Sequence, residues 1–434
     1  MRKPFGFAEA IPLEVLVMDS KKHLKAVAAH CLLAAAIGNA AVAGTIYVDT
    51  RAAGANNGSS WTNAYKNLQD ALTQAGSTGE PAEIRVAQGT YKPDLGKAQI
   101  PHDQQAAFQL NGGVTLMGGF AGSSAPNPNV RDVNLYATIL SGDLTDNDVV
   151  VNDPRALLAE PSRAENSHYV VTIGTTGMTA VLDGFTITGG SLHGMYIQSG
   201  SPTIINCTFH GNRAQRWGGG LCNENGSPRL IRCTFEQNGA QYGGGIWNLK
   251  GSPALTFCVF NGNSATYGGG MYNYDSSHPQ IINCAFTENS AKWGAGIYNN
   301  NNCRPTATNC TFARNSAGSN GGGIRNVHFS SPVLTNCILW GDAPDEIADY
   351  IMSSSIVRHS HVQGGTDEAW FGEGCIDGDP LFVGGDDLRL APGSPCIDAG
   401  DNTAVPSEIT TGLDDKPRLV NGIVDMGAFE AGAI

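Results

Sequence analysis

The amino-acid sequence predicts an all-β protein, a single-stranded right-handed parallel β-helix with a helix in its N-terminal cap. Glycine supplies 56 of the 434 residues, whereas Asp, Glu, Lys and Arg together supply only 15%. Cysteines recur every 25–27 residues through the middle of the chain, and glycine triplets keep the same register. Many tight turns, few charges and a repeat of this length are typical of a solenoid of stacked β coils.

Three series of residues that advance together define the repeat. The cysteines are Cys207, Cys233, Cys258, Cys284, Cys310 and Cys337, separated by 26, 25, 26, 26 and 27 residues. The asparagines are Asn212, Asn238, Asn263, Asn289 and Asn315. The glycine triplets begin at Gly218, Gly243, Gly268 and Gly321, with Gly294-Ala295-Gly296 in the remaining position. These triplets exclude helical repeats, since each glycine would destabilise a helix by about 1 kcal/mol.

Each repeat contains short strands with an alternating pattern. In the segment 204–209, alternation places Ile205, Cys207 and Phe209 on the buried face of one strand. A second inward position follows the glycines, at Leu221, Ile246, Met271, Ile297 and Ile324. We expect the recurrent asparagines to be left-handed turn residues whose side-chain amides bond to their copies one coil away.

The chain begins with a predicted signal peptide at residues 1–43. Lys21, Lys22 and Lys25 precede an apolar run at 26–37 and the small residues Ala41-Val42-Ala43, and Met18 is the expected start. The apolar run is too short to cross a bilayer, and the mature chain is expected to have no transmembrane segment. The protein is therefore expected to be secreted, or to lie at the cell surface or in association with the outer membrane.

Three further parts follow the signal peptide. Residues 44–113 are the predicted N-terminal cap, with strands at 45–48 and 83–86 and a helix at 61–75. Residues 114–340 are the predicted β-helix, whose less regular strands lie at 114–120, 137–142, 169–173, 181–188 and 195–197. Residues 341–434 are the last coils and a tail. A net charge of −13 argues against a nucleic-acid partner, because phosphate binding needs a basic surface.

The repeats carry two motifs that resemble a known family. One is Phe-x-x-Asn, as in Phe209 to Asn212, and the other is two glycines followed by an aliphatic residue, as in Gly219-Gly220-Leu221. Residues of about 180–340 resemble the repeats of polymorphic outer-membrane proteins and of bacterial β-helix proteins with pectin-lyase-like folds. The resemblance implies this architecture. Because many such folds cleave uronic-acid polymers, it also implies a polysaccharide lyase as an alternative function.

The C-terminal part resembles the tail of exported β-helix proteins described as choice-of-anchor domains. The matching segments are Asp379-Pro380-Leu381-Phe382, Gly393-Ser394-Pro395-Cys396-Ile397-Asp398-Ala399-Gly400, Lys416-Pro417-Arg418 and Val424-Asp425-Met426-Gly427-Ala428-Phe429-Glu430. The family usually has Asp-Leu-Asp-Gly before Lys-Pro-Arg, where this chain has Gly412-Leu413-Asp414-Asp415. This departure argues against a metal site at that turn.

Aromatic residues beside the glycine triplets are the candidate glycan-binding residues. Trp217, Tyr242, Tyr267 and Trp293 precede the glycines, and Trp247, Tyr272 and Tyr298 follow the inward aliphatic residue. We expect two exposed ladders on either side of a glycine-lined trough, which would suit sugar rings. The alternative is that the rings only cover the backbone and stack on one another.

Acidic turns and the remaining cysteines are the other candidate sites. Asp143, Asp146 and Asp148 are candidate calcium ligands, although solvated turn chemistry explains them as well. No other cofactor is expected. The six repeat cysteines are expected to be buried free thiols, because parallel Cβ vectors do not suit a disulfide. Cys375 and Cys396 are the candidate disulfide, while Cys222 and Cys303 have no predicted partner.

The predicted function is that of a binding or adhesion rod that acts as a monomer on extracellular or cell-envelope polysaccharide. Catalysis is the less favoured prediction. Cations along the coils, such as Arg232 and Lys250, are scattered over turns, and no catalytic residue is identified. A polysaccharide lyase and a purely structural surface protein remain the alternatives.

Overall fold

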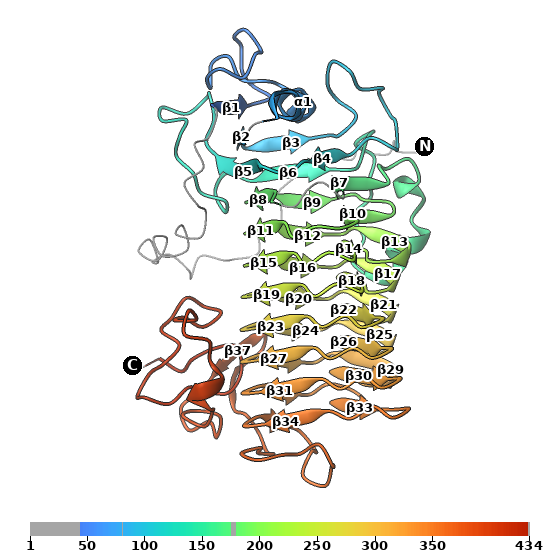
Figure 1. Ribbon diagram of the computed structural model, residues 1–434, viewed down its shortest axis with the longest axis vertical. Coiled ribbons are helices and arrows are strands. Elements are labelled where there is room, and N and C mark those ends of the chain that lie inside the picture. The colour runs from blue at the N-terminus through green and yellow to red at the C-terminus, as the bar shows by residue number, and fades with distance from the viewer. Residues whose placement is uncertain (1–43, 80, 175–178, 433–434) are drawn as a thin grey trace, which may run out of the picture. The chain divides into compact units, whose positions relative to one another are not determined.

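The computed structural model describes residues 44–79, 81–174 and 179–432. The described chain winds into a right-handed parallel β-helix, as predicted, with strands stacked in parallel along its length (Figure 1). The predicted signal peptide at residues 1–43 lies outside the described residues. No helix in the described ranges is long and apolar enough to cross a membrane.

Three long sheets and one short sheet form the walls of the β-helix. Sheet A contains β1 (Thr45–Val48), β2 (Ala82–Ala87), β5 (Val114–Phe120), β8 (Val181–Asp183), β11 (Thr203–Ile205), β15 (Arg229–Ile231), β19 (Ala254–Thr256), β23 (Gln280–Ile282), β27 (Thr306–Thr308), β31 (Val333–Thr335) and β34 (Ile356–Arg358). Sheet B contains β3 (Gly89–Tyr91), β6 (Thr138–Ser141), β9 (Thr186–Thr188), β12 (Thr208–His210), β16 (Thr234–Glu236), β20 (Val259–Asn261), β24 (Ala285–Thr287), β28 (Thr311–Ala313), β32 (Ile338–Trp340) and β35 (His361–Val362).

The other two walls follow sheet B, and the shorter of them is present, among the described residues, only in the coils from β13 to β29. The short one, named here the side sheet, contains β13 (Arg213–Trp217), β17 (Gly239–Tyr242), β21 (Ser264–Tyr267), β25 (Ser290–Trp293) and β29 (Ser316–Asn320). Sheet C contains β4 (Phe108–Leu110), β7 (Tyr169–Ile173), β10 (His193–Ile197), β14 (Leu221–Glu224), β18 (Ile246–Leu249), β22 (Met271–Tyr274), β26 (Ile297–Asn300), β30 (Ile324–Val327) and β33 (Ile347–Asp349). A glycine turn separates the side sheet from sheet C in each regular coil.

The corner between sheets A and B corrects one predicted register. Residues 204–209 form two strands, β11 and β12, because Asn206 takes a left-handed conformation with φ 51°. The bend interrupts the alternation, so Ile204 is fully buried while Ile205 is only partly buried. The same bend divides the strand predicted at 181–188 into β8 and β9, with Gly184 at φ 83°.

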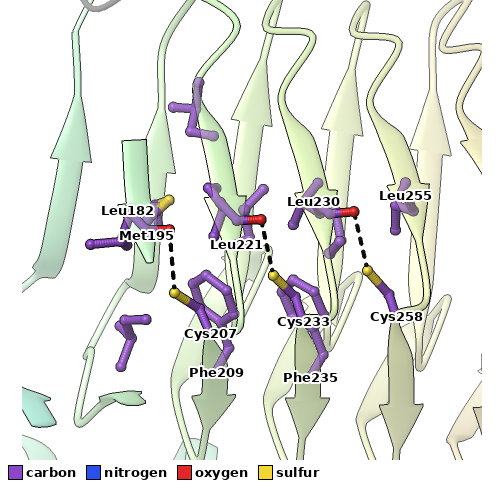
Figure 2. Close-up of a cluster of buried hydrophobic side chains, with 14 of the residues drawn as sticks. Leu182, Met195, Cys207, Phe209, Leu221, Leu230, Cys233, Phe235, Leu255 and Cys258 are labelled. Atoms are coloured by element: carbon purple, nitrogen blue, oxygen red, sulfur yellow. Dashed lines mark hydrogen bonds between the residues drawn. The ribbon is translucent and has the colours of Figure 1, made fainter. Parts of the chain in front are cut away.

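The core is a set of side-chain ladders that run along the β-helix. Figure 2 shows successive cysteines and phenylalanines pointing into the interior, with Cys207 Sγ donating to the carbonyl oxygen of Leu182 at 3.7 Å. Phe235 stacks on Phe209 and Phe260, with ring centroids 4.6 and 4.8 Å apart. The six repeat cysteines are buried and free, which confirms them as inward thiols. The inward aliphatic residues after the glycines are also buried, as predicted.

A buried asparagine ladder confirms one prediction and corrects another. Asn238 Nδ2 donates to Asn263 Oδ1 at 3.0 Å, one coil further on, and its backbone N–H donates to the same oxygen at 3.1 Å. The left-handed residue is, however, the one before the asparagine, such as Gln237 with φ 51°. A second ladder that the repeat pattern did not predict follows the inward aliphatic residues, at Asn223, Asn248, Asn273, Asn299 and Asn326.

The N-terminal cap contains α1 (Leu68–Thr78), which begins later than predicted. Leu68, Ala71 and Leu72 on this helix join the main core, so the helix covers the first coils as expected (Figure 1). Trp61 lies outside the helix and packs against Phe120, with ring centroids 5.6 Å apart. The helix ends at Thr78 and is capped by Gly79, whose left-handed φ of 67° is adopted most readily by glycine.

The chain after the last coil returns along the outside of the β-helix. Its hairpin consists of β36 (Phe382–Gly384) and β37 (Asp387–Leu390), and Figure 1 shows this part beside the later coils. Asn283 Nδ2 donates to the Thr411 carbonyl at 2.9 Å, and the Ala428 N–H donates to Thr311 Oγ1 at 3.0 Å. The tail is therefore bonded to corner and wall residues of the coils.

The predicted disulfide between Cys375 and Cys396 is not formed. Both thiols are free, and they belong to different parts of the interior. Cys375 packs against the main core, whereas Cys396 lies in a separate cluster with Ile338, Leu390 and Met426. The tail is held instead by hydrogen bonds and by the buried Arg418, whose Nη2 donates to the carbonyls of Asp425 and Gly427.

Candidate functional site

The glycine turns between the side sheet and sheet C are buried and do not form the open trough that was predicted. A Cβ added at Gly244 would lie 2.6 Å from the carbonyl oxygens of Gly269 and Ser264 in the next coil. The backbones are this close because they bond directly, with the Gly244 N–H donating to the Gly268 carbonyl at 3.0 Å. The glycines therefore allow adjacent coils to pack closely, and the surface for a ligand lies elsewhere.

The inner row of aromatic rings is also buried, contrary to expectation. Trp247, Tyr272 and Tyr298 are only 4%, 5% and 6% exposed and form a second apolar cluster with rings of the side sheet. Tyr272 Oη accepts a hydrogen bond from Asn300 Nδ2 at 3.0 Å. Burial raises the pKa of Tyr272 and of Tyr298. These three residues form the packing layer between the side sheet and sheet C.

The outer row consists of Trp217, Tyr242, Tyr267 and Trp293, one ring at the end of each successive strand of the side sheet, and all four are partly exposed. Tyr267 lies between Tyr242 and Trp293, with ring centroids 5.2 and 4.7 Å away and ring planes inclined by 10° and 21°. Stacking of this kind covers the ring faces and leaves the ring edges accessible. We name these four residues the aromatic seam.

Each ring of the seam carries a polar group that has no partner in the described protein. The hydroxyls of Tyr242 and Tyr267 and the indole N–H groups of Trp217 and Trp293 make no hydrogen bond to described residues, and none of them is a buried, unsatisfied group. They therefore reach solvent. The seam thus presents one free polar group per coil, in a line parallel to the axis of the β-helix.

Two exposed cations lie against the ends of the seam. The Arg216 guanidinium carbon is 4.6 Å from the ring centroid of Trp217, and Lys292 Nζ is 4.2 Å from that of Trp293. Such cation–π contacts hold the charged groups beside the rings. In register with the rings, Asn320 follows Trp293 in the side sheet, and Arg325 follows Tyr298 in sheet C.

The three candidate calcium ligands do not come together. The Asp143 carboxylate accepts backbone N–H groups of its own turn, from Thr145, Asn147 and Asp148. Asp146 pairs with Lys92 at 2.7 Å, and Asp148 pairs with Arg163 at 3.4 Å. In the described ranges, no group of three or more His, Cys, Asp or Glu side chains is arranged to hold a metal ion. Turn hydrogen bonds thus account for the Asp143 carboxylate, and ion pairs account for those of Asp146 and Asp148.

Three of the cations along the coils are held in ion pairs. Arg232 pairs with Asp415, Lys250 with Asp275 at 3.3 Å, and Arg314 with Glu288 at 3.5 Å. A lyase needs a cation free to neutralise the substrate carboxylate, close to a base. These paired side chains do not form such an arrangement.

Sequence reasoning missed a buried acidic pair at the end of the first asparagine ladder. Asp342 Oδ1 accepts from the backbone N–H of Asn315 at 2.6 Å and from its Nδ2 at 2.8 Å, while Glu346 Oε1 accepts from the Asp342 N–H at 3.1 Å. Burial raises the pKa of Asp342 to about 6. Burial, together with the neighbouring Asp342 charge, raises the pKa of Glu346 to about 11. With 7% and 5% exposure, the pair is closed to a polymer.

A match to a family model agrees with the fold. A family model described as "Right handed beta helix region" matches residues 162–339. No curated protein sequence matches the chain. Among solved structures, pectate lyase Pel9A is 15% identical, with a TM-score of 0.48, over 91% of this chain and 98% of that chain. Two structures of pectin methylesterase from Aspergillus niger, in differently deglycosylated forms, are 12% and 13% identical, with TM-scores of 0.27, over 78% of this chain and 84% of those chains.

Proposed function

We propose that this right-handed parallel β-helix is an exported protein of the cell surface or extracellular space that binds an extended polysaccharide along the aromatic seam. The observation that carries the proposal is the line of four partly exposed rings, each with a free polar group and each contributed by a successive coil. A polymer is the ligand that matches such a line, because the same contact is offered at every step of about 4.8 Å.

Binding at the seam uses ring edges and polar groups. Because neighbouring rings cover each other's faces, a sugar cannot stack flat on Tyr267. The edge of an aromatic ring is electropositive and attracts the oxygens of sugar hydroxyls. The tyrosine hydroxyls both donate and accept hydrogen bonds, and the indole N–H groups donate them. The seam therefore recognises hydroxyl-rich chains and leaves the ring stack intact.

Replacing hydroxyls while keeping the rings tests the proposal. The double variant Tyr242→Phe/Tyr267→Phe removes two free hydroxyls and retains the stacking. Each hydrogen bond contributes about 1 kcal/mol, so affinity should fall about tenfold or more. Affinity electrophoresis through gels that contain neutral or acidic polysaccharides measures this change. Retardation of the parent and the double variant to the same extent by every polysaccharide would place the site elsewhere.

A matched control comes from the inner row. Tyr272→Phe removes a buried hydroxyl that bonds Asn300, so it should lower the melting temperature and leave polysaccharide affinity unchanged. The same mixtures, followed by ultraviolet absorbance for an unsaturated sugar product, test the lyase alternative. N-terminal sequencing of protein recovered outside the cells tests export, since the predicted mature chain begins at Gly44.

A further inference from the structure

The strands of the side sheet, four of which carry the aromatic seam, contain no acidic residue. Their sequences are RAQRW, GAQY, SATY, SAKW and SAGSN, in β13, β17, β21, β25 and β29. The whole chain, in contrast, has 39 acidic residues against 26 Lys and Arg. The side sheet is therefore a locally cationic wall in an acidic protein.

The cations beside the seam are unpaired in the described protein, whereas several cations elsewhere in the protein are held in ion pairs. Arg131, Arg232 and Arg389, for example, each form an ion pair with an aspartate. Arg216 and Lys292 form no ion pair with any described residue, and both are exposed. Their charges are therefore available to a ligand at the two ends of the seam.

A third cation of this kind follows the inner ring row. The Arg325 guanidinium carbon lies 5.9 Å from the Tyr298 ring centroid and 4.5 Å from that of Tyr350. Its Nε and Nη1 are buried and have no hydrogen-bond partner among the described residues, and it forms no ion pair with them. Tyr350 Oη in turn accepts from Nδ2 of Asn320, the residue that follows Trp293 in register. The side chain is thus held by two tyrosines and lacks a counter-ion.

We propose that the exposed Arg216 and Lys292, with the partly buried charge of Arg325 nearby, make the aromatic seam selective for polysaccharides that carry carboxylate or sulfate groups. This inference rests on the binding function proposed above and specifies its ligand class. Arg216 and Lys292 are three coils apart, or about 14 Å at the usual strand spacing. A chain with repeated acidic groups reaches both cations while its hydroxyls contact the rings between them.

Selectivity follows from the way the cations are held. Ring contacts fix the charged groups before a ligand arrives, so little side-chain freedom is lost on binding. No carboxylate in the side-sheet strands competes with the ligand for these charges. Because the cations at the two ends are exposed, their attraction for the polymer is screened by salt. Binding of acidic chains should weaken as ionic strength rises.

Celluloses with the same backbone and different substituents provide the test. Affinity electrophoresis with hydroxyethyl cellulose, carboxymethyl cellulose and cellulose sulfate compares neutral, carboxylate and sulfate chains. The parent should bind one or both acidic chains at least tenfold more tightly than the neutral chain. The double variant Arg216→Gln/Lys292→Gln should lose about tenfold in affinity for the acidic chain and much of its salt dependence, with the neutral chain unaffected.

The control is a double variant with the same change in net charge at another place. Arg229 and Arg304 are exposed and form no ion pair with described residues, so Arg229→Gln/Arg304→Gln should bind as the parent does. Equal losses in both double variants would mean unspecific attraction and overturn the inference. Equal binding of neutral and acidic chains by the parent would overturn it too, with polysaccharide binding retained. A parent that binds no polysaccharide at all would contradict the proposed function itself.

Discussion

The last position of the first asparagine ladder is occupied by a carboxyl group. In the preceding coils each asparagine Nδ2 donates a hydrogen bond to the Oδ1 of the asparagine in the next coil. Each Oδ1 along the ladder thus accepts from the coil before it. The Asp342 side chain accepts from Asn315 in the same way but has no N–H to donate to a further coil. The nearby Glu346 holds a proton at neutral pH, because burial and the Asp342 charge raise its pKa to about 11. The pair thus ends the ladder with a single negative charge.

The raised pKa values of Asp342 and Glu346 predict that the free energy of unfolding depends on pH. In the unfolded chain Glu346 ionises near the ordinary glutamate pKa of 4.5, whereas in the folded chain it stays protonated up to a pKa of about 11. The folded state therefore holds the extra proton between these values, and its stability falls as the pH rises through that window. Asp342, whose pKa is raised to about 6, acts in the same direction. Glu346→Gln removes the titration and should increase stability at pH 9 by about 1–3 kcal/mol.

Urea denaturation of the parent and Glu346→Gln at pH 5, 7 and 9 measures this effect. The exposed Glu373 provides the control, since Glu373→Gln should leave the pH profile as it is. A Glu346→Gln variant that loses stability between pH 5 and pH 9 as steeply as the parent would contradict the assignment of the proton to this pair.

The glycine turn is the element that sets how closely two coils approach. Gly244 has an ordinary φ, so its requirement for glycine is steric. An alanine there would place Cβ 2.6 Å from two carbonyl oxygens that belong to backbone and cannot rotate away. At Gly262, at the corner after sheet B, the requirement for glycine is conformational, because its φ is +61°. Space is available there, since the nearest atom would lie 3.8 Å from an added Cβ. One glycine is needed for space and the other for conformation.

Alanine variants of these two glycines should therefore lose different amounts of stability. Gly244→Ala should destabilise the protein by about 3 kcal/mol or more, because two coils must separate. Gly262→Ala should cost only about 1 kcal/mol, the usual penalty of a left-handed residue with a side chain. Thermal melts of both variants beside the parent measure the difference. Equal melting temperatures for the two variants would show that the coils can shift to accommodate the methyl group.

The strands and turns of the coils show which features of the fold could be predicted from the sequence. The period of Cys207 and its copies predicted the stacked coils, the buried thiols and the phenylalanine ladder, because inward positions repeat with every coil. Alternation misplaced Ile205, since a single left-handed residue at Asn206 turns the chain through a corner that a pattern of hydrophobicity does not record. Trp247 was predicted to be exposed, because the sequence does not reveal that the side sheet packs its rings over sheet C.

The sequence predicted which residues belong to the candidate site, but it did not predict how they are arranged. The repeat identified both rows of rings, but which row is buried depends on the angle between two sheets. The Asp342–Glu346 pair was missed because Asp342 stands where a sixth asparagine is expected, and Glu346 belongs to no repeat. The predicted pairing of Cys375 with Cys396 failed because they pack into separate clusters, a distinction made only by the path of the tail.

At the scale of the whole molecule, the β-helix is a stack in which each coil contacts its neighbours. Phe260 illustrates this arrangement, since its fully buried ring lies between Phe235 and Phe286, 4.8 and 4.4 Å away. No single coil has a core of its own. Stability is therefore shared along the stack, and damage to one coil reaches the adjacent ones.

A charge buried in the middle of the stack tests whether stability is shared between neighbouring coils. Phe260→Asp places an unpaired carboxylate among apolar rings and should cost several kcal/mol. The adjacent Asn261 is partly exposed on the opposite face of β20, so Asn261→Asp adds the same charge at little cost. Hydrogen exchange should show lost protection over several coils on both sides of Phe260 in the first variant. Loss confined to residues 254–262 would contradict a stack stabilised by neighbour contacts.

Rings, asparagines and thiols recur in the same register, so one coil can be gained or lost in evolution as a single unit. Duplication of one stretch of about 26 residues would add a layer of core, a rung to each amide ladder and a ring to the seam in a single event. An insertion of one residue would break all of these at once. The length of the contact line is thus a quantity that evolution can change in whole steps, and related chains with more or fewer repeats would differ in how long a polymer they can hold.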